Sequence, residues 1–232
     1  GMCRSRIHVG GELKTLVYGR PISVHVDPIE KKPFYHFLPG RTAYSLGTAG
    51  CPLRCQYCDT AYAFSGGEWM GIDEIMEQVA SNSTRYVTVT GGEPLAQNAS
   101  IPLLARLCDA GYRVSLETSG ALDIASVDPR VVKVMDIKTP ASGEGKRNLL
   151  ENIDKLTEHD QVKFVICDEA DYEWSKHLMQ QYHLHQRCEV LFSPSYTQLP
   201  AVDLAEWILR DALPVRMQLQ MHKLIWGDQP GK

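Results

Sequence analysis

The 232-residue sequence lacks a long apolar run, an excess of basic residues and any internal repeat or low-complexity segment. No run approaches the roughly 18 apolar residues of a membrane span, and the first residues have no apolar core typical of a signal peptide. The formal net charge at pH 7 is −4, whereas nucleic-acid-binding surfaces are usually basic. These absences argue against membrane, exported and nucleic-acid-binding proteins, and we expect a cytoplasmic protein.

The seven cysteines are an odd number in a chain without an export signal, which argues against a disulfide framework. Cys108 and Cys167 stand in apolar patterns and are expected to be small buried hydrophobic residues. Three of the cysteines, Cys51, Cys55 and Cys58, fall within eight residues of one another.

Short apolar runs rich in β-branched residues alternate with amphipathic helical patterns from residue 43 onward. The predicted strands span 43–47, 86–90, 113–117, 131–136, 162–166, 190–192 and 215–220, and the predicted helices 72–81, 101–110, 149–156, 172–181 and 204–212. This alternation predicts an α/β fold with a parallel sheet, and six or so units are too few for a closed eight-fold barrel. We therefore predict a partial, open (β/α)6-type barrel over residues 43–232, preceded by an atypical N-terminal extension over residues 1–42.

The three close cysteines are spaced by three residues and then by two, unlike the paired C-x-x-C of a structural zinc site. Three thiolates can hold a [4Fe–4S] cluster and leave one iron open for a ligand. This spacing resembles the cluster loop of the radical S-adenosylmethionine (SAM) enzymes, in which SAM chelates that iron and is cleaved to a 5′-deoxyadenosyl radical. A three-cysteine zinc site completed by a histidine is the alternative.

A second motif, Thr90-Gly-Gly-Glu-Pro94, directly follows a predicted strand. Two glycines allow a backbone to approach a ligand closely, and their amides can hydrogen-bond it. The motif resembles the GGE motif of radical SAM enzymes. The resemblance implies that Gly92 contacts SAM and that Glu93 belongs to the cofactor-binding loop.

Further segments are similar to those of one family, the 7-carboxy-7-deazaguanine synthases of queuosine and deazapurine biosynthesis. They are Cys51–Thr60, Glu117–Gly120, Asp136–Lys138, Ser193–Ser195 and the ending Gln218–Gly227. The match covers about residues 45–230. It implies a carbon–nitrogen lyase that converts 6-carboxy-5,6,7,8-tetrahydropterin to 7-carboxy-7-deazaguanine with loss of ammonia, while SAM is regenerated.

The resemblance also implies roles for individual residues. Thr60 would bind Mg²⁺, a hard cation suited to a hydroxyl ligand, although a helix N-cap is the alternative. The implied cofactor contacts are Glu117, Asp136, Lys138, Ser193, Pro194, Ser195 and Tyr196. The implied substrate contacts are Thr90, His222 and Lys223, the last two alternatively capping the final strand. Asp136 and Lys138 are alternatively an ion pair at a strand end. Family members tend to be homodimers, and a low-potential donor such as flavodoxin or ferredoxin would reduce the cluster.

The N-terminal segment departs from the family. The usual S-L-Q-G-E-G opening is absent, and Gly47 stands four residues before Cys51, where the family has an arginine that holds the pterin carboxylate. Residues 3–50 instead resemble the AmmeMemoRadiSam proteins, which are similar to pyruvate formate-lyase activators. Arg41 or Arg20 is our candidate to replace the missing arginine, since a guanidinium can bind a carboxylate with two hydrogen bonds.

Two further functions remain open from the sequence. The first is a radical SAM activase that abstracts hydrogen from a glycine of a partner protein. The second is a non-catalytic metal-binding module.

Overall fold

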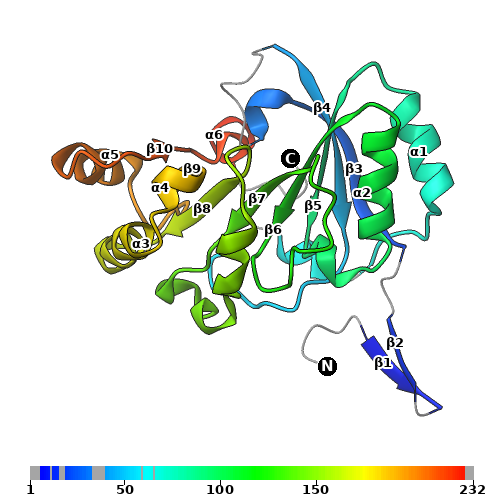
Figure 1. Cartoon of the computed structure of the whole chain (residues 1–232), viewed down its shortest axis with the longest axis horizontal. Coiled ribbons are helices and arrows are strands. Elements are labelled where there is room, and N and C mark those ends of the chain that lie inside the picture. Colours follow the sequence, from blue (N-terminus) through cyan, green and yellow to red (C-terminus); the bar gives the residue numbers. More distant parts are fainter. Residues whose placement is uncertain are drawn as a thin grey trace.

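An open, mostly parallel sheet forms the centre of the protein in a computed structural model that describes residues 6–10, 12–15, 19–32, 40–58, 60–64 and 66–227. Its eight strands follow the order β10-β9-β8-β7-β6-β5-β4-β3 (Figure 1). Strands β4 to β10 run parallel to their neighbours, and β3 pairs with β4 antiparallel. Within the described residues β3 and β10 remain the two edges, so the sheet is unclosed, as predicted for a partial barrel.

The strands of this sheet are β3 (Pro21–Pro28), β4 (Thr42–Thr48), β5 (Tyr86–Gly91), β6 (Arg113–Thr118), β7 (Val132–Asp136), β8 (Gln161–Ile166), β9 (Glu189–Pro194) and β10 (Arg216–Met217). A separate antiparallel pair is formed by β1 (Arg6–Val9) and β2 (Glu12–Thr15). The α-helices are α1 (Ile72–Ala80), α2 (Ser100–Asp109), α3 (Glu169–Gln181), α4 (Leu184–Arg187), α5 (Ala201–Arg210) and α6 (Met221–Trp226).

Short 3₁₀ helices connect these elements: η1 (Ile29–Lys31), η2 (Ala61–Phe64), η3 (Pro94–Ala96), η4 (Pro140–Ser142), η5 (Gly145–Arg147) and η6 (Leu150–Lys155). The predicted α-helix at 149–156 is therefore wrong in type, since its main part is η6. Asn152 explains the tighter winding, because its side-chain amide donates to the carbonyls of Gly120 and Leu122 and fixes the segment against the end of β6.

The last predicted strand, 215–220, is largely wrong. Only Arg216 and Met217 pair with β9, and the chain then turns into α6, where no helix was predicted. A single hydrogen bond from the Gln218 amide to the Phe192 carbonyl continues the strand direction before the turn. His222 and Lys223 consequently lie in a helix, and they do not cap a strand.

The strand β3 in the N-terminal extension was not predicted. It bonds along its whole length to β4, with Val24 opposite Leu46 and His25 opposite Ser45. Part of the predicted extension therefore belongs to the same sheet as the barrel. Cys3 and the prolines at 33 and 39 lie outside the described residues.

Side chains alternate between two environments along each strand of the sheet. Apolar residues such as Leu46, Val89 and Phe164 join the core that α1, α2 and α3 cover. Their sequence neighbours point the other way, as Ser45, Thr90 and Lys163 do, and line a cavity. The strand period of two thus packs one face against helices and gives the other face to a polar site.

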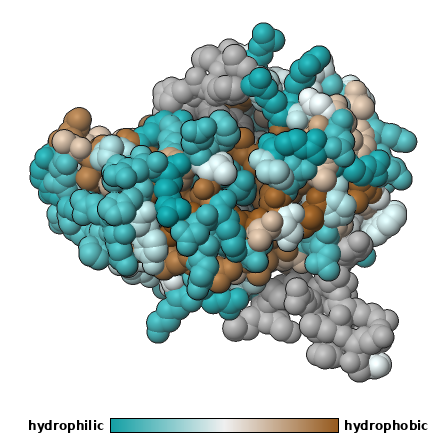
Figure 2. All heavy atoms as spheres, viewed as in Figure 1, coloured by the Kyte–Doolittle hydropathy of each residue, from teal (hydrophilic) through white to brown (hydrophobic). Residues whose placement is uncertain are grey.

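The face shown in Figure 2 is mostly hydrophilic, with apolar side chains interspersed among polar ones. None of the helices in the described part of the chain is both long and apolar enough to span a bilayer.

Candidate radical SAM active site

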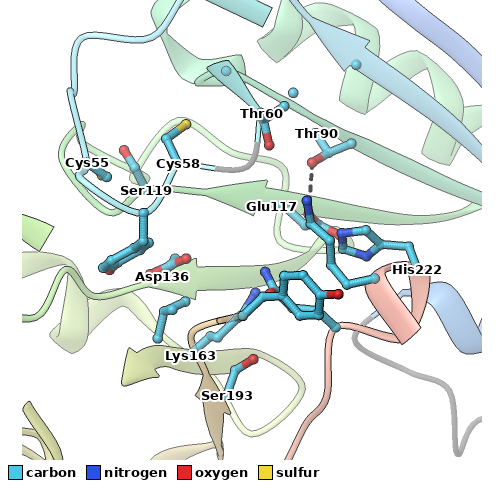
Figure 3. Close-up of a pocket in the computed structure, with 18 of the residues that line it drawn as sticks. Cys55, Cys58, Thr60, Thr90, Glu117, Ser119, Asp136, Lys163, Ser193 and His222 are labelled. Atoms are coloured by element: carbon cyan, nitrogen blue, oxygen red, sulfur yellow. Dashed lines mark hydrogen bonds between the residues drawn. The ribbon is translucent and has the colours of Figure 1, made fainter. Parts of the chain in front are cut away.

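A cavity of about 560 Å³ opens on the inner face of the sheet, where the carboxyl ends of the parallel strands meet (Figure 3). This volume is typical of small-molecule and cofactor sites. Residues two apart on the same strand line it together: Ser45 and Gly47 on β4, Lys163 and Val165 on β8. Ligands of open parallel sheets bind at this edge because the strand ends and their following loops converge there.

Cys51, Cys55 and Cys58 all line this cavity from the loop after β4. The Cys58 amide donates to the Cys55 carbonyl, a tight turn that holds these two residues close. Burial raises the pKa of Cys51 and of Cys55 to about 11, so both thiols are protonated at neutral pH until a metal centre displaces the protons.

The donor chemistry fits an iron–sulfur cluster. Among the described residues no group of three histidine, cysteine or carboxylate side chains is already spaced to hold a single metal ion. Three thiols around an open cavity nevertheless supply the soft ligands that an iron–sulfur cluster requires.

The two glycines after β5 bring the TGGEP segment against the cysteine loop. Gly91 has φ of +112°, a conformation that favours glycine, and a Cβ at Gly92 would come within 2.4 Å of the Gly50 carbonyl oxygen. The amide of Gly92 donates to the carbonyl of Thr48, and that of Glu93 to the carbonyl of Gly50. The Gly92 amide is therefore bonded within the protein, while Gly92 itself lines the cavity, and its contact with SAM stays a prediction.

Glu93 is fully buried and does not line the cavity. Its carboxylate accepts hydrogen bonds from the hydroxyl of Thr118, from the amide and hydroxyl of Ser119, and from the amide of Leu95. Glu93 was predicted to belong to the cofactor-binding loop, and its side chain lies behind that loop without facing the cavity. Glu93 instead ties the end of β5 to the end of β6, a buried charge stabilised by several donors.

Several buried polar atoms on the cavity wall have no hydrogen-bond partner among the described residues. They include Oδ1 of Asp136, Oγ of Ser193 and Oε1 of Gln218. Because buried polar atoms are nearly always paired in folded proteins, such atoms facing one cavity indicate a polar ligand. SAM, with its amino, carboxylate, ribose and adenine groups, fits this set.

Asp136 also forms an ion pair with Lys138, with 3.2 Å between Oδ2 and Nζ. Burial alone would lower the pKa of Lys138, but Asp136, together with Tyr57 and Cys55, holds that pKa above its usual range. Lys138 therefore remains positively charged beside the thiols. Asp136 and Lys138 thus form the ion pair that was one prediction, and both also line the cavity, as the predicted cofactor contact requires.

Thr90 and Glu117 are joined across β5 and β6 by a hydrogen bond of 2.8 Å from Oγ1 to Oε2 (Figure 3). Both side chains face the cavity, as does Thr60, which immediately precedes η2. The bond fixes the Glu117 carboxylate at the cavity wall.

The helix α6 closes another side of the cavity through His222 and Lys223. The Lys223 ammonium lies 5.8 Å from the centre of the Tyr196 ring, a distance suited to a cation–π contact. Of the residues predicted to form the site, only Glu93 and Pro194 lie outside the cavity lining.

The sequence analysis missed a second wall made by the N-terminal segment. Ser23, His25 and Asp27 alternate on one face of β3 and line the cavity, followed by Lys31 and Lys32. The alternation of these polar residues with Ile22, Val24 and Val26 was a strand signal, but nearby glycines and prolines obscured it. Lys163 of β8 was also missed, since a lysine in an apolar run carries no motif.

Comparisons with known proteins agree with this geometry. The Radical SAM superfamily model matches residues 45–138. The fold is similar to the crystal structure of QueE from Escherichia coli, with TM-score 0.67, 17% identity, and 88% of this chain and 94% of that chain covered. It is also similar to Streptococcus suis SuiB bound to S-adenosylmethionine, with TM-score 0.52, 13% identity, and 76% and 46% covered. The fold and the cysteine-lined cavity define a radical SAM enzyme, a class that uses a [4Fe–4S] cluster and SAM.

Curated relatives narrow the class. The chain is 41% identical to the 7-carboxy-7-deazaguanine synthase of Koribacter versatilis, over 83% of this chain and 94% of the relative. It is 42% identical to that of Chlorobaculum tepidum, over 86% and 95%. The chain belongs to the 7-carboxy-7-deazaguanine synthase family.

Proposed function

We propose that this enzyme is a carbon–nitrogen lyase that converts 6-carboxy-5,6,7,8-tetrahydropterin to 7-carboxy-7-deazaguanine and ammonia. The observation that carries the proposal is the convergence of the three thiols, the unpaired polar atoms and a set of lysines on one cavity of a chain from this family. When bound, the cluster and SAM would supply the 5′-deoxyadenosyl radical that removes hydrogen from C6 of the pterin and later returns it.

The chain's own residues would position these groups. Cys51, Cys55 and Cys58 would hold the cluster. Asp136 and Ser193 present the unpaired atoms that suit SAM. Glu117, fixed by Thr90, has a second carboxylate oxygen for the ribose hydroxyls.

Mg²⁺ at Thr60 belongs to the same proposal. The Thr60 side chain faces the cavity beside the cysteine loop, and a hydroxyl is a hard donor. A flavodoxin or ferredoxin as reductant and a homodimeric state are proposed from the family resemblance. Sedimentation of the purified protein tests the dimer, and reduction by each electron donor tests the reductant.

The decisive experiment is anaerobic. The protein is reconstituted with iron and sulfide and incubated with 6-carboxytetrahydropterin, SAM and a reductant, and the products are separated by chromatography. Ring-contracted product and ammonia in equal amounts, without net loss of SAM, support the proposal. Deoxyadenosine without ring-contracted product would contradict it in favour of a radical SAM activase. A full cluster without any SAM cleavage would favour a non-catalytic metal-binding module.

A further inference from the structure

The N-terminal wall of the cavity carries a buried cluster of charges, Asp27, Lys31 and Lys32. The Asp27 carboxylate lies 2.9 Å from the Lys31 ammonium through Oδ1 and 3.2 Å from the Lys32 ammonium through Oδ2. Ser45 of β4 donates a hydrogen bond of 2.6 Å to the same Oδ2. All four residues line the cavity.

The cluster has one more positive charge than its carboxylate can neutralise. Burial alone would raise the pKa of Asp27, but Lys32, Lys31 and Ser45 together lower it to about 2, so Asp27 is ionised at neutral pH. Two ammonium groups therefore share one carboxylate. No other carboxylate lies within ion-pair distance of either lysine in the described part of the chain.

Lys32 is the more buried of the two lysines, with a side chain 8% exposed against 13% for Lys31. Its contact with Asp27 is also the longer one, and Lys31 and Ser45 already satisfy both carboxylate oxygens. A buried charge that is only partly compensated is costly unless a further anion pairs with it. Lys32 and Asp27 both line the cavity, so a further anion could reach Lys32 from there.

The cavity as a whole also has an excess of positive charge, which suits an anionic ligand. Its described lining contains five lysines and three carboxylates, in a chain whose formal net charge is −4. η1, which ends at Lys31, packs against α6, which carries His222 and Lys223. Figure 1 shows these two segments side by side, α6 in red and η1 in blue. Cations from both ends of the chain thus meet at one side of the cavity.

Arg20 and Arg41, the arginines considered from the sequence, do not take part. Both are exposed and neither lines the cavity. The position of the family's arginine, here Gly47, lies opposite Ser23 of β3, and a Cβ there would come within 2.3 Å of the Ser23 hydroxyl oxygen. β3 therefore occupies the space beside Gly47 and brings its own charged segment to the cavity.

We propose that Lys32 binds the carboxylate of the substrate, while Lys31 neutralises Asp27. The inference rests on the proposed function, since it names the residue that recognises that substrate. An ammonium group paired to a carboxylate out of water is a charge-assisted hydrogen bond, and its loss weakens binding by about 10- to 100-fold.

Equilibrium dialysis on the cluster-loaded protein with SAM and without reductant tests this assignment. Two ligands are compared, 6-carboxytetrahydropterin and tetrahydropterin without the carboxylate. Lys32→Met is expected to raise the Kd of the carboxylate ligand by about 10- to 100-fold and to change that of the other ligand by less than about 2-fold. Lys32→Arg keeps the positive charge and should therefore bind the carboxylate ligand with a Kd close to that of the wild type. Arg41→Ala, which removes an exposed cation near the same segment, is the matched control and should change neither Kd.

Asp27→Asn is a second variant, and it should not weaken binding of the carboxylate ligand. Removing the internal anion leaves both lysines for the ligand, so the carboxylate ligand should bind as tightly as to the wild type or more tightly. Iron content and thermal unfolding confirm that each variant is folded and loaded.

The wild type and Lys32→Met could both prefer 6-carboxytetrahydropterin over tetrahydropterin by the same ratio of Kd values. That result would overturn this inference and leave the proposed function standing. If Lys32→Met and Asp27→Asn weakened binding of the carboxylate ligand equally, the inference would also be overturned, because the charged residues Asp27, Lys31 and Lys32 would then only hold β3 in place. A wild-type protein that neither binds nor converts 6-carboxytetrahydropterin would instead overturn the proposed function.

Discussion

Gly47 of β4 and Ser23 of β3 are register partners, and their facing sides are so close that a Cβ at Gly47 would lie 2.3 Å from the Ser23 Oγ atom. β3 of the N-terminal segment and β4 of the barrel thus pack closely at Gly47. The absence of a side chain at this position allows β3 to pair with β4 along the cavity.

Introducing the family's arginine should therefore harm this protein. We expect Gly47→Arg to lower the free energy of unfolding by about 1–3 kcal/mol, because an overpacked contact must displace β3. Ser23→Gly in the same chain should recover part of this loss. Denaturant unfolding of the single and double variants measures both effects, and a Gly47→Arg protein as stable as the wild type would contradict the close contact.

The buried Asp27 carboxylate should make stability depend on pH. Its pKa is lowered from 3.8 to about 2, so the folded state favours the ionised form. This contribution, about 2 kcal/mol, is fully present above pH 4 and is lost as pH falls toward 2. Asp27→Asn should consequently be less stable than wild type at pH 7, and the difference should shrink below pH 4.

Asp73→Asn is the control for this pH dependence. Asp73 pairs with Arg106 on the surface, with its side chain 84% exposed, so the substitution should change unfolding little at any pH. A constant difference between wild type and Asp27→Asn from pH 7 to pH 3 would argue against an ionised, lysine-paired Asp27.

Glu93 should matter for structure more than for ligand contact. Glu93→Gln places an amide group where only donors face it, next to the Ser119 amide and the Thr118 hydroxyl. We expect a loss of about 1–3 kcal/mol in unfolding free energy. The exposed Glu77→Gln on α1 should change it by less than about 0.5 kcal/mol, and equal stability of the two variants would be inconsistent with the buried network.

The three cavity cysteines should be needed for the cluster, and a cysteine elsewhere should not. After anaerobic reconstitution, Cys58→Ala should keep only a small fraction of the about four irons per chain expected for a [4Fe–4S] cluster. Cys108→Ala, on α2 and away from the cavity, should keep them all. Iron and sulfide assays decide this, and zinc in place of iron in the wild type would point to the zinc alternative.

Thr60 should determine the response to Mg²⁺. If its hydroxyl binds the ion, Thr60→Ala should lose most of the activity gained on adding Mg²⁺, and Thr60→Ser should retain it because the hard oxygen donor is preserved. Turnover after chelation and after readdition of Mg²⁺ measures the effect. Unchanged stimulation in Thr60→Ala would indicate that Thr60 only precedes η2.

Local sequence patterns predicted much of the barrel. The strand cores at 86–90 and 113–117 and the helix at 72–81 lie within one residue of β5, β6 and α1 at their ends, because period and β-branching are local properties. The 3₁₀ winding of η6 and the helix α6 were missed. The first depends on Asn152 bonding across to another loop, which no local period reveals.

The sequence by itself determined the chemistry of the cysteine loop, since three thiols with one spacing and a Gly-Gly-Glu segment one strand later are local features. Only the tertiary structure decided which charges line the same cavity as the cysteine loop. Lys32 and Lys223 lie far apart in the chain, yet η1 packs against α6. Such contacts arise from sheet order and strand pairing over long sequence separations, and they turned an unassigned N-terminal segment into a wall of the active site.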